Sequence, residues 1–453
     1  MSATEQPVHD HSTAALDHGR RGSLGQIVSW CLWDFGSNAY NTVILSFVFS
    51  VYVTTAAAPD EQTGQQVFAN MQTVAGIIVA LLAPVIGVWA DRVRRRRLML
   101  SVSTLLVVAS VSMCWFVLPY ETHHGLKYLY LGAGLIALAN MMQQVAEIFY
   151  NSMLVDISTP SNVGRISGAA WGLGYLGGVI TLAATLALFV LDGGFLGVPE
   201  QDAMNYRAIA VFCAGWLLVM SVPVMIWGPP APPAKGDART LNVVSAYAQV
   251  FRHLRRKFRT SPQVLGFLVA SAVYRDGLSA VFAFAGVIAA TSYGMDTTEI
   301  IIFGLAANFA AALGAWVFGL VDDRVGPRFV ILASLATMVV FGGLILAISA
   351  TAMFWIGGLG ISSLVGPVQS ASRTLLTRVI EPGEENEMFG LYNTVGRAAS
   401  WIAPGLIGIF TALLGTRLGL LGIVLTLLGG LILFWFVRIE GVTHNRSRVT
   451  SAA

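Results

Sequence analysis

The chain has 453 residues, of which 55% are hydrophobic and only 11% are charged, and its mean hydropathy is +0.70. Soluble domains carry about 25% charged residues, so this composition excludes an ordinary soluble protein and predicts an all-α membrane protein. The net charge of +3 gives no support for a nucleic-acid partner, and the lipid bilayer is the first partner that we expect.

The predicted elements begin after a polar segment. Residues 1–23 lack the apolar centre of a signal peptide, so we expect a cytoplasmic tail there. A helix that crosses a bilayer needs roughly 20 mostly apolar residues. Twelve such runs follow, at 26–56, 66–90, 98–119, 128–155, 165–191, 206–228, 263–292, 298–320, 327–350, 352–377, 388–414 and 416–438.

A long polar break separates the sixth run from the seventh. It starts as GPPAPPAKGDARTLN (228–242), and its proline-rich, charged composition predicts an exposed linker. We therefore predict two six-helix bundles between two tails. The boundaries are 24–228 for the N-terminal bundle, 229–262 for a cytoplasmic linker, 263–438 for the C-terminal bundle and 439–453 for a cytoplasmic tail.

The placement of basic residues predicts the orientation. Arginines cluster at 92–97, 252–259 and 324–328, whereas the loops at the other helix ends are poor in arginine and lysine. By the positive-inside rule both termini are cytoplasmic, which agrees with an even number of spans.

A short motif occurs twice, once after the second run and once after the eighth. GVWADRVRRRR (87–97) and GLVDDRVGPRF (319–329) are separated by 232 residues, which indicates an internal repeat. An acid at such a helix end can pair with an arginine across the seam between the halves and accept from a helix N-terminus, which would hold one conformer. The alternative is a purely topogenic cluster. The candidate latch residues are Gly87, Asp91, Arg92, Gly319, Asp323 and Arg324.

Polar residues follow one helix face in the first and fourth spans. Their helical spacing predicts two stripes that point into the bundle. An acid inside a bilayer costs roughly 2.5–3.5 kcal/mol, so Asp34 and Glu147 indicate a cavity that the two carboxylates could share with one proton. The alternative is that polar groups only join helices by hydrogen bonds. The stripes are Trp30, Asp34, Asn38 and Asn41, and Asn140, Gln144, Glu147 and Asn151.

The second half supplies arginines. Tyr274, Arg275 and Asp276 echo the first stripe, and Gln369 lies one helical turn before Arg373. An arginine fork could bind a carboxylate, so acids on one half and arginines on the other would suit a zwitterion. Two simpler alternatives are that Arg275 only neutralises Asp276 and that Arg373 reaches lipid phosphate.

Small residues predict close helix packing in two further spans, and we assign both groups to the seam between the halves. They are Gly174 with Gly178, and Gly304, Ala307, Ala311 and Gly314.

These motifs together resemble known transporters. The repeated Gly-x-x-x-Asp-Arg pattern resembles the loop motif of the major facilitator superfamily, although Arg94 stands where glycine is usual. Three segments are similar to the vacuole-effluxer branch of that superfamily. They are WCLWDFGSN at 30–38 in the first span, YRDG at 274–277 and FGLYNTVGRAAS at 389–400. That branch comprises fungal autophagy-related vacuolar amino-acid effluxers and their bacterial relatives. The resemblance implies the twelve-helix major facilitator fold and secondary transport of an amino acid or similar small solute.

We therefore expect a monomeric transporter in a bacterial cytoplasmic membrane, with a small-molecule substrate. Coupling to H⁺ fits the acids, and a sodium site at Asp34 and Asn38 stays open. We expect no other cofactor and no enzymatic activity, because the chain has no Gly-Lys-Ser/Thr phosphate loop and no His/Cys cluster. The alternatives are a sodium-coupled or uncoupled carrier of a sugar, peptide or drug-like solute, and a membrane scaffold.

Overall fold

The computed structural model describes residues 22–93, 95–190, 195–230, 261–295, 297–381 and 384–438, with the single residues 248, 252 and 255 between the third and fourth ranges. Within them the chain is helical apart from short connections. Eleven of the described helices are long and apolar enough to cross a bilayer. The prediction of an all-helical membrane protein is confirmed.

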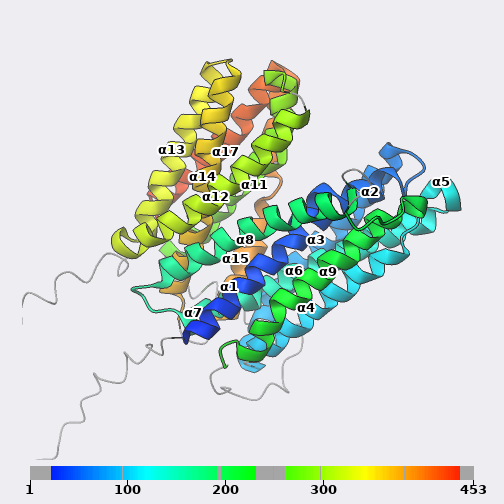
Figure 1. Ribbon diagram of the computed structural model, residues 1–453. Helices are drawn as coiled ribbons and strands as arrows, with labels where there is room; N and C mark the ends of the chain where they lie inside the picture. The colour runs from blue at the N-terminus through cyan, green and yellow to red at the C-terminus, as the bar shows by residue number, and fades with distance from the viewer. Residues whose placement is uncertain are drawn as a thin grey trace, which may run out of the picture.

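The N-terminal bundle comprises the helices before residue 228 (Figure 1). In chain order they are α1 (Leu24–Asn38), η1 (Ala39–Phe47), α2 (Phe49–Thr55), α3 (Glu61–Val93), α4 (Arg96–Met113), η2 (Cys114–Phe116), α5 (Tyr120–His123), α6 (Leu126–Ser152), α7 (Leu154–Ile157), α8 (Val163–Thr185), η3 (Leu186–Val190), η5 (Gln201–Ala203) and α9 (Met204–Trp227).

The C-terminal bundle comprises the helices after residue 261. They are α11 (Pro262–Tyr293), α12 (Thr297–Val325), α13 (Pro327–Ala347), α14 (Thr351–Val379), α15 (Glu385–Ala399), α16 (Ile402–Leu414), η7 (Thr416–Gly419) and α17 (Leu420–Trp435). The predicted linker and both tails fall almost entirely outside the described residues, so those boundaries stay predictions.

The first predicted span is interrupted. Ser23 and Gln26 form a capping box that starts α1, in which each side chain accepts from the backbone N–H of the other residue. At Ala39 the α-helix gives way to the π-helical segment η1, and Val48 separates η1 from α2. This span is the predicted one that is not among the eleven. π-Helical turns are often found at functional sites.

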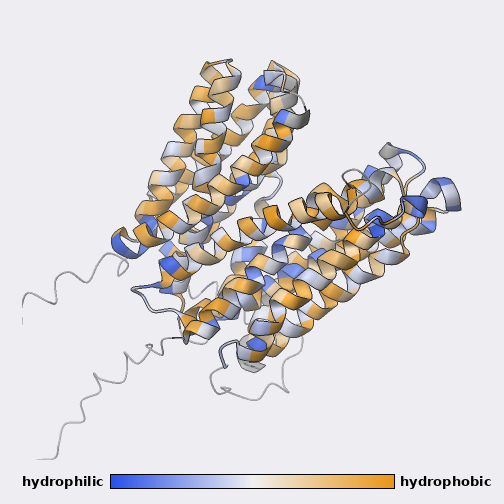
Figure 2. Cartoon of the chain, viewed as in Figure 1, coloured by the Kyte–Doolittle hydropathy of each residue, from blue (hydrophilic) through white to orange (hydrophobic). Residues whose placement is uncertain are grey.

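Hydrophobic residues run along the helices, and hydrophilic residues gather mainly near their ends (Figure 2). Trp316 and Ile356 illustrate the outer surface, because they are 60% and 62% exposed although both are large and apolar. An apolar surface of this kind is stable against lipid chains rather than water.

The two bundles repeat two contacts at the same ends of equivalent helices. Tyr52 Oη donates to the carbonyl of Val117 at 2.8 Å, and Tyr293 Oη donates to the carbonyl of Ile345 at 2.7 Å. Close by, Arg207 Nε donates to the carbonyl of Trp115 at 2.6 Å, and Arg417 Nη2 donates to the carbonyl of Leu346 at 2.8 Å. Each tyrosine and arginine thereby satisfies a carbonyl at a helix C-terminus, where such groups lack an intrahelical partner.

A third repeated contact lies at the opposite helix ends. Arg97 Nη1 donates to the carbonyls of Ile226 and Gly228, at 3.1 and 3.4 Å, where α9 ends. Arg328 donates to the carbonyls of Trp435 and Val437, at 3.0 and 2.9 Å, where α17 ends. In both bundles an arginine therefore ties the start of the third span to the end of the last one, and its charge favours the helix C-terminus.

The bundles meet at one end and diverge toward the other (Figure 1). We call the meeting end the arginine-rich end, because Arg96, Arg165, Arg324 and Arg378 lie there. We call the contact surface between the bundles the seam. Helix α8 packs along α12, and α3 packs along α15. Each of these pairs joins one bundle to the other.

Glycines allow α8 to approach α12 closely. A Cβ atom at Gly168 would lie 2.8 Å from the Cα of Gly319, and one at Gly172 would lie 2.9 Å from the carbonyl oxygen of Ala312. Any larger side chain would push the two backbones apart, so this row of glycines makes the seam.

Three of the glycines that we assigned to the seam instead pack within a single bundle, so the prediction is wrong for them. Gly174 faces Asn38, and Gly178 faces Thr42, within the N-terminal bundle. Gly314 packs against the backbone of Ser363 within the C-terminal bundle. The prediction failed because a small-residue stripe indicates a close neighbour without identifying it.

Candidate functional site

Asp34 lies where α1 packs against α8. Its Oδ2 accepts a hydrogen bond from Tyr150 Oη at 3.2 Å. A Cβ atom at Gly174 would lie 3.3 Å from Asp34 Oδ1, so the glycine leaves room for the carboxylate. Arg373 is the opposite charge that acts on Asp34 most strongly, and Glu147 is a second carboxylate within electrostatic reach.

The other residues of the first stripe have different roles. Asn38 Nδ2 donates to the backbone carbonyl of Asp34 at 3.0 Å, so its amide is bonded within its own helix. Trp30 is fully buried and donates from Nε1 to the carbonyl of Tyr150 at 2.8 Å. Asn41 falls within η1, so the predicted alignment of Asn41 with Asp34, which assumed 3.6 residues per turn, does not apply there.

Arg373 extends from α14 across the seam and is only 3% exposed. Its Nε donates to Ser167 Oγ at 3.0 Å, and its Nη2 donates to the Ser167 carbonyl at 2.9 Å. Its Nη1 donates to Asn151 Oδ1 at 3.2 Å. The guanidinium carbon also lies 4.8 Å from the centre of the Trp30 ring, which is a cation–π contact. Thus Arg373 of the C-terminal bundle is held by the N-terminal bundle.

Glu147 on α6 faces a second group of arginines. Arg397 and Arg275 are the opposite charges that act on it most strongly, and both belong to the C-terminal bundle. Arg275 stacks on Tyr392 at 4.0 Å and donates to the Tyr392 carbonyl at 3.3 Å. Arg397 is exposed on α15. Both intramembrane acids of the N-terminal bundle therefore have arginines of the other bundle within electrostatic reach.

Amide side chains extend from α6 to α3 inside the N-terminal bundle. Gln144 Nε2 donates to Asn140 Oδ1 at 3.1 Å, and Asn140 Nδ2 donates to Gln72 Oε1 at 2.8 Å. The bond of Asn140 to Gln72 agrees with the alternative that polar groups join helices, whereas the bond of Gln144 lies within α6.

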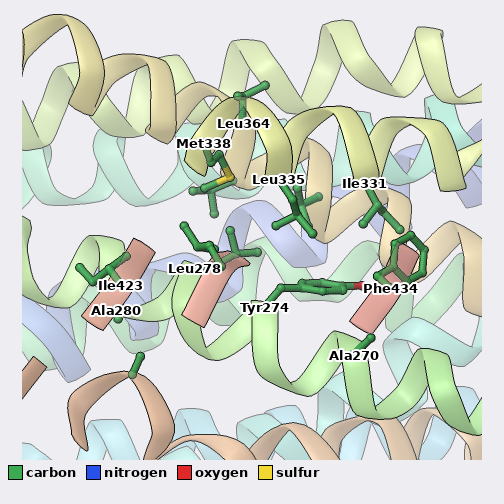
Figure 3. Packing of buried hydrophobic residues seen from close by; sticks show 14 of the residues in the cluster. Ala270, Tyr274, Leu278, Ala280, Ile331, Leu335, Met338, Leu364, Ile423 and Phe434 are labelled. Carbon is green, nitrogen blue, oxygen red and sulfur yellow. The ribbon is translucent and has the colours of Figure 1, made fainter. Parts of the chain in front are cut away.

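Tyr274 and Asp276 of the second half lie apart from Asp34 and Arg373. Tyr274 is buried in the core of the C-terminal bundle near Phe434 (Figure 3), and its Oη hydrogen bonds with Ser372 Oγ at 2.7 Å. Asp276 Oδ2 accepts from the backbone N–H of Ala403 at 2.6 Å. Gln369 is partly buried one turn before Arg373, and no hydrogen bond of its side chain is described.

The position of Asp276 explains a break in the eleventh predicted span. Helix α15 ends at Ala399 and α16 begins at Ile402, so Ala403 belongs to the first turn of α16. A carboxylate is a good acceptor for the free N–H groups of a first turn. Asp276 therefore caps α16, and Arg275 does not neutralise it through an ion pair among the described contacts.

Asp323 of the repeated motif bonds across the seam. Its Oδ1 accepts from the N–H of Gly164 at 2.8 Å, and its Oδ2 accepts from the N–H of Arg165 at 3.1 Å. The Arg165 side chain adds an ion pair at 2.9 Å. Since Gly164 and Arg165 begin α8, an acid of the C-terminal bundle caps a helix of the N-terminal bundle. Arg324 is exposed and takes no part in this cap.

The two motif glycines occupy equivalent places. A Cβ atom at Gly319 would lie 2.8 Å from the carbonyl oxygen of Gly164, at the start of α8. A Cβ atom at Gly87 would lie 2.6 Å from the carbonyl oxygen of Asn386, at the start of α15. Each glycine thus admits the first turn of a helix from the other bundle. The side chains of Asp91 and Arg92 lie outside the described part of the structure.

The sequence interpretation missed a second set of contacts at the arginine-rich end. Arg96 Nη2 lies 2.7 Å from Glu385 Oε2 across the seam, and its Nη1 lies 2.9 Å from Asp156 Oδ2. Ser152 Oγ donates to Asn386 Oδ1 at 2.6 Å. Arg96 belongs to the basic run 92–97, for which the sequence left both a topogenic role and a gating role open. The available signal was the group of acids at 384–387, which is unusual at an end that is otherwise basic.

Among the described residues, no group of three or more His, Cys, Asp or Glu side chains is arranged to hold a metal ion. The charged groups of the seam are instead carboxylates and guanidinium groups, which suit an organic ion or a proton.

Comparison with known proteins places this architecture in a family. The family model described as "Vacuole effluxer Atg22 like" matches residues 65–446. The chain is 23% identical to the uncharacterized MFS-type transporter YxiO of Bacillus subtilis (strain 168), over 92% of this chain and 95% of that protein. It is 24% identical to autophagy-related protein 22 of Botryotinia fuckeliana (strain B05.10), over 61% of this chain and 50% of that protein.

The chain thus spans only about half the length of this fungal relative. Among solved structures, the major facilitator transporter FucP in the outward conformation matches with a TM-score of 0.69 at 13% identity, over 92% of this chain and 98% of that one. The predicted major facilitator fold is confirmed.

Proposed function

The chain belongs to the Atg22-like vacuole effluxer family of major facilitator transporters, and on that premise we propose that it exports an amino acid or a related small zwitterion by alternating access. The family and fold make it a secondary transporter and not an enzyme. The substrate, the direction and the coupling ion are the parts that we propose.

The observation that carries the proposal is the division of charge across the seam. Asp34 and Glu147 belong to the N-terminal bundle, and the arginines that act on them, Arg373, Arg275 and Arg397, belong to the C-terminal bundle. An ammonium group would bind the carboxylates, and a carboxylate group would bind the guanidinium groups. A zwitterion could therefore bridge the bundles while they change partners. In a rocking transporter the substrate site lies between such halves.

We further propose that the contacts of Asp323 form a latch. The cap on α8 and the ion pair with Arg165 can exist only while the bundles meet at the arginine-rich end. Opening this end breaks both contacts, so they favour the closed conformer. Gly87 supports an equivalent latch at α15, in which Asp91 and Arg92 would take part.

Proton coupling is the proposed energy source. Asp34 and Glu147 are within electrostatic reach of each other as well as of arginines, so a proton on one changes the net charge of the whole group. Sodium coupling is the alternative, because carboxylate and amide oxygens are suitable sodium ligands. We place the arginine-rich end and both termini in the cytoplasm of a bacterial cell and treat the protein as a monomer, in line with the positive-inside rule.

The test is transport in proteoliposomes that contain the purified protein. These vesicles are loaded with a panel of labelled amino acids, dipeptides and sugars. They should release a zwitterionic amino acid at least about tenfold faster than vesicles that carry the same solutes but no protein. Arg275→Lys keeps the charge but loses the planar fork that binds a carboxylate, so it should slow the release of zwitterions more than the release of simple amines. Release of sugars alone would refute the zwitterion assignment and keep the carrier assignment.

A further inference from the structure

The guanidinium group of Arg373 sits in a box made of aromatic rings and oxygen acceptors. The carbon of the guanidinium lies 4.8 Å from the Trp30 ring centre, 5.6 Å from that of Tyr150 and 5.7 Å from that of Trp171. Ser167 and Asn151 supply the three acceptors described above. We call these five residues the guanidinium box. Asp34 adds a negative charge next to it.

Every wall of the box belongs to the N-terminal bundle, and contacts within that bundle hold its two stacked rings in place. Tyr150 stacks on Trp30 with ring centres 4.4 Å apart, and the Tyr150 hydroxyl is fixed by Asp34. Tyr150 also stacks on Trp33, again with ring centres 4.4 Å apart, and Trp33 Nε1 donates to Thr104 Oγ1 at 3.0 Å. The two stacked rings of the box, Trp30 and Tyr150, are therefore held by contacts within the N-terminal bundle.

Arg373 comes from α14, and Ser370 of the same helix also hydrogen bonds with Ser167 of the box, at 2.9 and 3.1 Å. All three described hydrogen bonds of its guanidinium group go to the N-terminal bundle. When the bundles separate at the arginine-rich end, Arg373 must leave with α14, and the box with its nearby carboxylate opens to the same side. A preformed aromatic cage beside a carboxylate binds cations.

We propose that the guanidinium box is a binding site for a free guanidinium compound, which competes with Arg373 for the box when the arginine-rich end is open. The inference rests on the alternating-access function proposed above. A guanidinium group fits better than an ammonium group, because the acceptors of Ser167 and Asn151 match a planar fork of N–H donors and the rings match its flat face.

Competition has a consequence for the transport cycle. A free guanidinium ion in the box prevents Arg373 from docking, so the arginine-rich end stays open. A guanidinium compound on that side therefore inhibits closure. In an Arg373→Ala variant the relation reverses, because the closed seam then contains an empty guanidinium-sized space that the free ion can fill.

The test measures the opening of the arginine-rich end directly. Spin labels are placed at Ser161, before α8, and at Val325, the last residue of α12, which are both exposed and lie on different bundles. The three buried cysteines, Cys31, Cys114 and Cys213, are replaced by alanine beforehand. The full-length protein in lipid nanodiscs is titrated with guanidinium chloride at low millimolar concentration, and potassium chloride at the same ionic strength serves as the ion control.

Guanidinium should raise the population with the longer label distance by at least about twofold in the parent protein and lower it in Arg373→Ala. Trp30→Phe and Ser167→Ala each remove part of the box and should weaken both effects. Arg207→Ala is the matched control, because Arg207 makes the same kind of cation–π contact, 4.6 Å from the Trp115 ring, far from the seam. The control should respond to guanidinium as the parent does.

Shifts of the same sign in the parent and in Arg373→Ala, or an unchanged response in Trp30→Phe and Ser167→Ala together, would overturn the proposal. The proposed function fails in a different way. If the label distance does not change under any condition in either the parent or Arg373→Ala, the seam does not open and alternating access itself is refuted. If Arg373→Ala opens the seam but guanidinium changes neither protein, only the box as a ligand site is refuted.

Discussion

The N-terminal and C-terminal bundles are built on the same plan at their ends and differ at their centres. Arg97 and Arg328 close equivalent helix ends, and so do Tyr52 and Tyr293. The acids that correspond in sequence do not correspond in role. Asp34 lies at the seam near Arg373, whereas Asp276 caps α16 inside its own bundle. The repeat therefore preserves the parts that hold each bundle together, and the interior has diverged.

The sharpest way to break this comparison is to neutralise the two acids separately. Asp34→Asn should lower the transport rate roughly 100-fold, which corresponds to about 3 kcal/mol, because the variant loses a charge-assisted contact at the site. Asp276→Ala should instead lower the stability of the folded protein by about 1–2 kcal/mol, because it leaves the first turn of α16 without its cap. Transport assays and thermal unfolding of both purified variants give the comparison.

The contrast fails if the outcomes are exchanged. A stable Asp276→Ala protein that has lost transport at a normal level of folded protein would place this acid in the site, as the repeat alone predicts. Glu147→Gln is the companion variant for Asp34→Asn, and it should impair transport without lowering the melting temperature by more than a few degrees.

The second prediction concerns the latch formed by Asp323, whose contacts across the seam lie within the described residues. Asp323→Ala removes a cross-seam cap and an ion pair, so the arginine-rich end should open about tenfold more often, which corresponds to roughly 1.4 kcal/mol. The change can be read as the distance between labels at Ser161 and Val325. Arg324→Ala is the matched control, and a similar opening in that variant would show that general positive charge, not the Asp323 cap, keeps the end closed.

The third prediction sharpens the similarity of the two bundles. Arg97→Ala and Arg328→Ala should each lower stability by about 1 kcal/mol, because each leaves carbonyl groups at a helix C-terminus without a charged donor. The double variant should lose the sum within about 0.5 kcal/mol, since the two contacts share no partner. Thermal unfolding in the same detergent checks both statements, and a large effect in one bundle alone would show that the two staples are not equivalent.

The smallest expected effect is that of the two tyrosines. Tyr52→Phe and Tyr293→Phe each remove one hydrogen bond to a helix-terminal carbonyl, and such bonds in membrane proteins contribute about 0.6 kcal/mol. Both variants should keep full transport. A loss of transport in Tyr293→Phe with normal stability would mean that the opposite ends of the bundles take part in gating.

Much of the fold could be predicted because one physical requirement determines it. A bilayer demands long apolar helices, so the apolar runs marked nearly all the spans that the structure contains. The interruptions were not predicted. The break after Ala399 depends on a carboxylate from α11, and the π-helical turn at Ala39 occurs inside an otherwise apolar run. Local composition does not contain either cause.

The candidate site was predictable in its acids and less so in its partners. The helical period and the cost of an intramembrane charge singled out Asp34, Glu147 and Arg373. The sequence could not reveal that Arg373 crosses to Ser167 and Asn151, because the register between two bundles is a property of the folded chain. Arg397 is also an intramembrane charge but was left out of the predicted site because it lies on the eleventh span, yet it is the first of the arginines that act on Glu147.

Because Asp323 caps α8, hydrogen exchange at the backbone of α8 can report on the opening of the arginine-rich end. The amide hydrogens of Gly164 and Arg165 are bonded to a carboxylate of the other bundle, so they can exchange with deuterated water only when the bundles part. Their exchange rate, relative to amides deeper in α8, would count openings without any label attached to the protein. A solute that drives the cycle would then be recognised by faster deuterium uptake at these two positions, even before its movement across a membrane is detected.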